Sequence, residues 1–487
     1  MYSLKRLEVI SLINLIKNEL YKIFHKKGIY IVLIITALFT LLTNAIYNSN
    51  FLEEFDMEAD IEIEIYYTET LEEAGETDSE DYLSSKIYIA THKYAESFGK
   101  DSWQRYILIN NLEYSTRLGE IIERITKYEL KRSNDKEDYE KAIKEKDALT
   151  AELNNMNWME FLDEEIKNTQ EELKQAVEEN HTFMYKAKLE ALKLRKEHNI
   201  KYGFDEFNEY LEIYQSNRAT VLSYEQIDEN TLKQEEKTNK KEAIKETEIS
   251  KYKIENHIEK VSYGSNYYIF SNFYTEFFTM ILVIIVLVGG SIVSEEFSKG
   301  TIKLLLVKPY TRTKILLSKF LTVLIMILFA IISVFIMQMI IGGIFFGYDS
   351  LSIPYVTYNM TTSTIESISV LRYFLLSTIA ILPQLILIGT IAFALSTITT
   401  STSLANTLTI IGVFGSDIIN GIAQSFEIEW LKFFPTLNWD YNCYLFGGNS
   451  PYKGITLPFS ISICLIYFVV ILLITFLVFK KKNIKNV

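Results

Sequence analysis

The chain has 487 residues, of which 48% are hydrophobic and 23% are charged, and its net charge is −13. Its mean hydropathy of +0.09 suits an ordinary soluble acidic protein, but this average hides two unlike parts. Residues 51–270 hold 51 acidic and 30 basic side chains, a balance of −21, which leaves +8 for the rest of the chain. This division excludes a single soluble domain and indicates a membrane protein with a large polar insertion.

Five long stretches without a charged residue predict the membrane-spanning helices, because a helix needs about 20 apolar residues to cross the hydrocarbon core. The stretches are residues 29–47, 277–294, 320–348, 373–416 and 454–479. The fourth is too long for one crossing, and we expect a turn in its Ser- and Thr-rich part at residues 396–403. The sequence therefore predicts six spans, five of them within residues 271–487.

Basic residues near the spans predict the orientation. The segment before the first span, the loop after the second and the C-terminal tail hold 16 Lys and Arg residues, whereas the other short loops hold three. Because such residues gather on the cytoplasmic side, we expect both termini in the cytoplasm and residues 48–270 outside the cell, in a multi-pass protein of the cell membrane.

No small-residue cleavage site follows the first span, so it is expected to be an uncleaved anchor. Residues 1–28, which precede it, carry apolar side chains at helical spacing and predict an amphipathic helix at the lipid surface. The side chains expected to face lipid headgroups are Lys17, Lys22, Lys26 and Lys27. The alternative is a plain cytoplasmic extension of the first span, residues 29–47.

The inserted block, residues 51–270, contains no proline, so long helices are permitted there. Breaks at residues 154–155 and 201–203 predict several helices folded back on one another, while the alternating apolar and acidic residues at 61–67 predict a short strand. The fold class is thus an all-α integral membrane protein with a mainly helical extracellular domain. The acidic charge belongs either to a solvated surface or to a domain that attracts cationic peptides or ions.

Signatures of catalysis are missing from the sequence. Gly99–Lys100 lacks the upstream glycine of a phosphate-binding loop, and two cysteines, Cys443 and Cys464, are too few for a disulfide framework. The five histidines have no ligand spacing. We expect a non-catalytic chain that binds no cofactor, no metal and no nucleic acid.

Residues 294–320, which follow the second span, form the most informative segment. Thr301 is placed to cap a short helix that Pro309 ends, and Thr311 is placed to cap the helix that enters the third span. An acidic pair, Glu295 and Glu296, stands at the start and basic residues follow. By spacing alone, a generic basic inner loop that leads into a membrane helix is the alternative interpretation.

The same segment resembles the cytoplasmic elbow of ABC-2-type permeases, the membrane subunits of one class of ATP-binding-cassette exporters. The residues that carry the resemblance are Glu295, Glu296, Gly300, Thr301, Leu304, Leu305, Pro309, Arg312, Ser318 and Lys319. The six spans, the inner termini and the amphipathic helix are similar to that family as well, over residues 1–50 and 271–487. Short members lack the insertion, but permeases of sodium-efflux and peptide-export type can carry large ones.

The resemblance implies that the elbow docks into a groove of a separate ATPase subunit, which would bind ATP and Mg²⁺. The implied coupling residues are Glu295, Glu296, Gly300, Thr301, Pro309, Arg312 and Lys319. The two glutamates would pair with cationic side chains of the ATPase, Gly300 and Pro309 would set the bend, and Arg312 and Lys319 would lie at the lipid or ATPase boundary. Such permeases act as two copies or as a pair of related chains, so we expect a dimer embedded in membrane lipid.

Two further features of the spans each leave two interpretations open. Asp417 is an ionisable residue well inside a predicted span, so it is either a transport residue or a packing residue hydrogen-bonded near Asn420. The small residues at 289–291 and 343–347 support close helix packing, either between two copies or within one.

The function expected from these features is a permease subunit that couples ATP hydrolysis by its partner to export of an antimicrobial peptide, a lipid-like molecule or an ion. A receptor, sensor or scaffold that displays the helical domain is the alternative. An ion-coupled secondary transporter is disfavoured, because it would need several intramembrane ionisable residues and only Asp417 qualifies.

Overall fold

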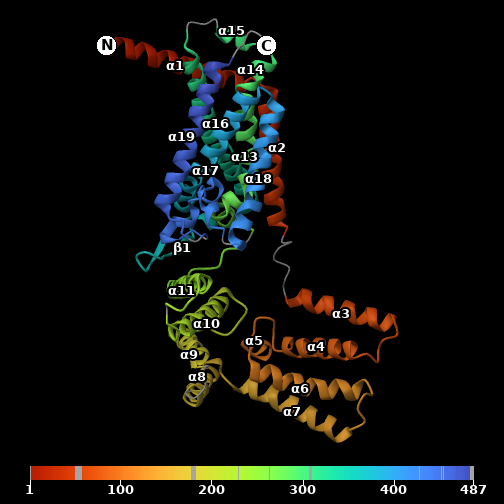
Figure 1. The fold of residues 1–487 in the computed structure, drawn as a ribbon. Helices are drawn as coiled ribbons and strands as arrows, with labels where there is room; N and C mark the ends of the chain where they lie inside the picture. Colours follow the sequence, from red (N-terminus) through yellow and green to blue (C-terminus); the bar gives the residue numbers. More distant parts are fainter. Residues whose placement is uncertain are drawn as a thin grey trace.

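The computed structural model describes residues 2–49, 57–176, 182–228, 230–262, 264–306, 310–426, 428–450, 452 and 454–482. Within them, six helices are long and apolar enough to cross a membrane, and they form one bundle (Figure 1). These helices are α2 (Lys27–Asn48), α13 (Phe273–Ser291), α16 (Arg312–Phe346), α17 (Val370–Thr399), α18 (Thr402–Phe426) and α19 (Leu457–Lys481). The predicted all-α membrane fold is confirmed.

The turn between α17 and α18 falls inside the Ser- and Thr-rich run. Thr400 adopts a left-handed backbone conformation with φ of 56° and so ends α17. Lys482, beyond the end of α19, donates through Nζ to the carbonyl oxygens of Thr397 and Ile398 at 2.8 and 3.2 Å. Two carbonyl oxygens that the helix end leaves without a backbone partner thus receive hydrogen bonds, and the loop to α18 can be short.

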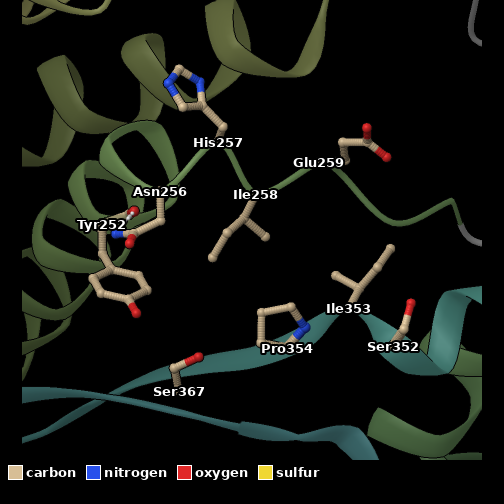
Figure 2. Close-up of a pocket in the computed structure, with 9 residues that line it drawn as sticks. All are labelled: Tyr252, Asn256, His257, Ile258, Glu259, Ser352, Ile353, Pro354 and Ser367. Carbon is tan, nitrogen blue, oxygen red and sulfur yellow. Dashed lines mark hydrogen bonds between the residues drawn. The ribbon is translucent and has the colours of Figure 1, made fainter.

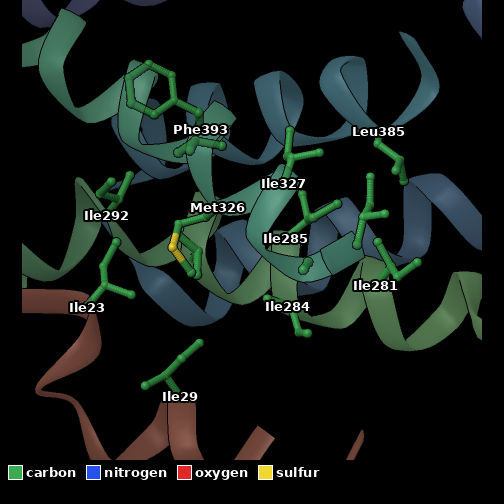
Figure 3. Close-up of a cluster of buried hydrophobic side chains, with 14 of the residues drawn as sticks. Ile23, Ile29, Ile281, Ile284, Ile285, Ile292, Met326, Ile327, Leu385 and Phe393 are labelled. Atoms are coloured by element: carbon green, nitrogen blue, oxygen red, sulfur yellow. The ribbon is translucent and has the colours of Figure 1, made fainter. Parts of the chain in front are cut away.

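The core of the bundle is built around α13, whose buried side chains pack against α16 and α17 (Figure 3). Ile285 of α13, Ile327 of α16 and Leu385 of α17 are each at most 1% exposed. Near the C-terminal end of α13, Gly289 allows α13 and α17 to approach closely. A methyl group on Gly289 would lie 2.9 Å from Cβ of Ala392 in α17. This small surface therefore packs within one chain.

Among the described residues of the inserted domain, the regular secondary structure is entirely helical. Its helices are α3 (Met57–Glu73), α4 (Glu80–Glu96), α5 (Trp103–Asn110), α6 (Leu112–Glu129), α7 (Lys136–Asn155), α8 (Trp158–Gln175), α9 (Thr182–Glu197), α10 (Glu206–Glu225) and α11 (Gln234–Glu255). The predicted breaks at residues 154–155 and 201–203 are confirmed. A core that includes Leu118, Leu149 and Leu162, all fully buried, holds the layers together.

The predicted strand at residues 61–67 is wrong, because this segment lies within α3. Ile61, Thr68 and Leu71 are buried against α4 at helical spacing, and Ser85 of α4 donates a hydrogen bond to Glu64. The alternation of Ile and Glu is therefore incidental: burial follows every third and fourth residue and not every second.

The two ends of the insertion meet at the bundle. A methyl group built on Gly264 would lie 2.9 Å from the carbonyl oxygen of Tyr47. The next helix, α12 (Asn266–Ser271), belongs to the bundle core, since Ile269 and Phe270 are at most 1% exposed. The structural boundary of the inserted domain thus lies near residue 262 rather than at 270.

A short hairpin between α16 and α17 contacts the inserted domain at α11. It follows η2 (Asp349–Ser352) and consists of β1 (Pro354–Asn359) and β2 (Thr364–Ser369), which pair antiparallel with Pro354 opposite Ser369. Between α11 and the hairpin lies a groove of about 440 Å³, with Tyr252 and His257 on one side and Pro354 and Ser367 on the other (Figure 2).

The aromatic segment between α18 and α19 folds into short 3₁₀ helices. They are η3 (Glu429–Phe433), η4 (Pro435–Leu437) and η5 (Asn442–Gly447). Trp439 is buried, whereas Trp430 is 62% exposed. These helices lie at the same end of the bundle as the hairpin (Figure 1).

Candidate functional site

The predicted elbow lies at the end of the bundle opposite the inserted domain, together with both termini (Figure 1). Two short helices form it, α14 (Ser294–Ser298) and α15 (Ile302–Leu306), separated by Gly300 with φ of 70°. Helix α1 (Tyr2–Phe24) runs across this end and packs against α16. It is separated from α2 by a break at residues 25–26, so it is no plain extension of the first span.

Lys319 is the centre of a buried ion network at the elbow. Its side chain is 1% exposed, and its Nζ lies 2.6 Å from Oε2 of Glu19 and 3.4 Å from Oε1 of Glu296. The same Nζ donates to the carbonyl oxygen of Ile292 at 2.9 Å. One ammonium group therefore joins α1, the start of the elbow and α16.

Glu296 is bound from three directions. Besides Lys319, Lys22 of α1 lies 2.7 Å from its Oε1, and the Thr301 hydroxyl donates to its other oxygen. Burial by itself would raise the pKa of this carboxyl, but the charge of Lys319 and the bonds from Lys22 and Thr301 outweigh burial and lower the pKa to about 2. Glu296 is thus an anion at physiological pH.

Glu295 forms a second, more open pair of contacts. It is bonded to Lys26, just after α1, and its Oε1 lies 2.5 Å from Nζ of Lys299. Burial opposes ionisation, yet the bonds from the two lysines lower the pKa of Glu295. Across the whole network, three carboxylates face four ammonium groups.

The C-terminal end of α19 is fastened to the same elbow. Arg312, the first residue of α16, donates to the carbonyl oxygens of Lys480 and Lys482 at 3.1 and 3.0 Å. The ammonium group of Lys482 also lies 4.8 Å from the ring centre of Phe297 in α14. A movement of the elbow would therefore act on α1, α16, α17 and α19 together.

A polar triad joins α2 to the bundle at the other end. Asn44 donates to Gln338 of α16 at 2.8 Å, and Gln338 donates back to Asn44 and to Asn266 of α12 at 3.1 Å. All three side chains are fully buried. Asn266 in turn donates to the carbonyl oxygen of Gly347 at 2.5 Å, so every group of the triad has partners.

The structure brings together four of the predicted coupling residues, Glu295, Glu296, Thr301 and Lys319. Lys319 does not lie at a lipid or ATPase boundary; that prediction is corrected, because its ammonium group is buried between two carboxylates. The Thr301 hydroxyl, which was predicted to cap the short helix, donates to Glu296. Gly300 sits at the bend, Arg312 contacts the α19 end, and Pro309 lies outside the described residues.

Sequence reasoning missed Glu19 and misplaced Lys22 and Lys26. The two lysines point to the acids of the elbow, although their side chains remain 39% and 38% exposed. Glu19 is 5% exposed. The available signal was an acid within the apolar stripe of α1, three residues before Lys22 and so placed to pair with a cation.

Asp417 lies on the exposed face of α18, beside Ile418, which is 68% exposed. Asn420 donates to the carbonyl oxygen of Thr436 at 3.5 Å and not to Asp417. Among the described residues, no hydrogen bond to Asp417 is found. The interpretation of Asp417 as a hydrogen-bonded packing residue within one chain is therefore not supported.

The fold and the elbow define a multi-pass, all-α membrane protein. A protein-family profile described as "Protein of unknown function (DUF2705)" matches residues 241–485, and the chain belongs to this family. The match includes the larger part of α11, the hairpin, the elbow and five of the six long apolar helices.

Two proteins of Bacillus subtilis (strain 168) are similar to this chain. The uncharacterized protein YhcI is 30% identical over 257 residues, which are 50% of this chain and 78% of YhcI. The uncharacterized membrane protein YdbK is 25% identical over 204 residues, which are 41% of this chain and 76% of YdbK. The aligned stretch is a larger share of each relative than of this chain, so both relatives are shorter than this chain. No solved structure matches the chain.

Proposed function

We propose that this protein is the permease subunit of an ATP-binding-cassette exporter and that its elbow receives movement from a separate ATPase. The observation that carries the proposal is the buried network around Lys319, which ties a projecting pair of short helices rigidly to the end of the bundle. A coupling element needs this rigidity, because a loosely held loop would absorb a push rather than transmit it. The basic residues near this end support a cytoplasmic location.

The tip of the elbow offers a contact for such a partner. Leu304 of α15 is 73% exposed, whereas its neighbour Ile302 is fully buried. In Figure 1, α15 projects beyond the ends of the long helices. An apolar side chain presented there, next to Lys303, suits a groove on another protein.

Glu295 and Glu296 were expected to pair with cationic side chains of the ATPase, but the structure pairs them within the chain. Glu295 and Glu296 are already neutralised by lysines of the same chain, so they position the elbow and do not offer free charges to a partner. We therefore assign docking to the tip around Leu304 and assign rigidity to Glu19, Glu296 and Lys319.

A second copy of the chain, or a related permease, is part of the proposal. The exposed side of α18 bears Ile411, Phe414 and Ile418, which are 61%, 54% and 68% exposed, and Asp417 lies at the edge of this side. A charged side chain facing lipid costs about 2.5–3.5 kcal/mol on insertion scales, and a partner covering this face would remove that cost. With the elbow in the cytoplasm, the inserted domain at the opposite end of the bundle (Figure 1) would lie outside the cell.

The experiment is co-expression with a candidate ATP-binding-cassette ATPase subunit. Leu304→Asp should abolish co-purification and stimulated ATP turnover while the permease stays folded. The matched control is Leu112→Asp, at an 82% exposed leucine of α6. Equal co-purification of both variants would contradict docking at the tip.

A further inference from the structure

Helix α3 carries an apolar stripe that nothing in the described chain covers. Ile63, Tyr66 and Tyr67 are 63%, 72% and 42% exposed, and their spacing of three and four residues puts them on one face. The opposite face, with Ile61 and Thr68, is buried against α4. The stripe therefore points away from the rest of the inserted domain.

The position of α3 in the chain keeps it close to the membrane. Helix α2 ends at Asn48, and α3 begins at Met57. The chain between Ser49 and Met57 can reach at most about 28 Å when fully extended. The start of α3 therefore lies within this distance of the end of α2.

The layers of the inserted domain show which way the stripe faces. Helices α3, α4, α6 and α7 are stacked in this order, with α3 nearest the plane where the bundle ends and α7 farthest from it (Figure 1). Since α4 covers the far face of α3, the stripe faces that plane, beside α2. In a membrane, this plane would be the surface of the lipid bilayer.

We propose that α3 rests on the lipid surface beside α2, with Ile63, Tyr66 and Tyr67 in the headgroup layer. Tyrosine is enriched at this depth because its ring is apolar and its hydroxyl remains hydrated. The contact braces the inserted domain against the bilayer. Exposed acids of the same helix, such as Glu62 and Glu69, favour a zwitterionic surface over an anionic one.

The test uses the full-length protein in phosphatidylcholine nanodiscs. Cys443 and Cys464 are replaced by alanine, and an environment-sensitive fluorophore is attached at Tyr66→Cys. The matched control is Ala148→Cys, an exposed position on α7. A second stripe position, Ile63→Cys, repeats the measurement in case the first variant elutes differently from the parent.

Fluorescence at residues 66 and 63 should be quenched at least about threefold more by headgroup-labelled lipid than fluorescence at residue 148, and it should be shielded from aqueous iodide. Equal iodide access at all three positions would overturn the proposal. Shielding from iodide without quenching by labelled lipid would also overturn it, because a protein surface such as a second copy would then cover the stripe.

Discussion

The Nζ of Lys319 and Oε2 of Glu19 lie 2.6 Å apart, although 300 residues separate them in the chain. Both side chains are withdrawn from solvent, with exposures of 1% and 7%. This pair fixes α1 to α16 at the end of the bundle that carries the elbow. Because burial makes each charge dependent on the other, the pair is a sensitive point for experiment.

Replacing Lys319 by methionine should destabilise the protein by about 3–5 kcal/mol, because two buried carboxylates would lose their central cation. The measurement is thermal or denaturant unfolding in detergent. Lys314→Met on the same helix is the control and should have little effect. A double variant, Lys319→Met with Glu19→Gln, should recover part of the loss, and no recovery would mean that the two residues are not coupled.

The stability contributed by Glu296 should depend on pH in a defined window. Its pKa is lowered from 4.5 to about 2 on folding, so its contribution is complete above about pH 4.5 and is lost as the pH falls towards 2. Glu296→Gln should therefore be less stable than the parent at pH 7, and this difference should shrink below pH 4.5. An unchanged difference at pH 3 would contradict the assignment.

Much of this architecture could be predicted from the sequence, because uncharged runs of membrane length and breaks between helices are local signals. The turn before Thr402 and the end of α7 at Asn155 are examples. The network around Lys319 could not be predicted, since the pairing of Glu19 with a lysine 300 residues away depends on tertiary packing. The prediction of a strand at residues 61–67 was wrong for the same reason, because packing against α4 favours a helix there.

Deletion of the inserted domain should leave the bundle intact if the deletion ends before α12. Replacing residues 57–258 by a short flexible linker should preserve membrane insertion and a monodisperse elution profile, because Tyr47 and Gly264 are already in contact. Removal of residues 51–270 is the comparison. It deletes Asn266, Ile269 and Phe270 from the bundle core, so it should lower the unfolding midpoint markedly. Equal midpoints for the two deletions would disprove the boundary near residue 262.

The exposed face of α18 should lie between two copies of the chain. With Cys443 and Cys464 replaced, a cysteine at Phe414 should form a disulfide-linked dimer on mild oxidation in membranes. A cysteine at Ile466, which is 57% exposed on α19, is the control and should stay monomeric. Similar cross-linking at both positions would indicate random collision and would remove the support for a dimer through α18.

The central claim is that the tip of the elbow docks on an ATPase, and cross-linking at Leu304 tests it most directly. A photoreactive group at Leu304→Cys should form a covalent adduct with the co-expressed ATPase, and the adduct should be absent from the same group at Ala148→Cys on α7. Labelling of lipid alone at Leu304, with an ATPase present and active, would contradict the account.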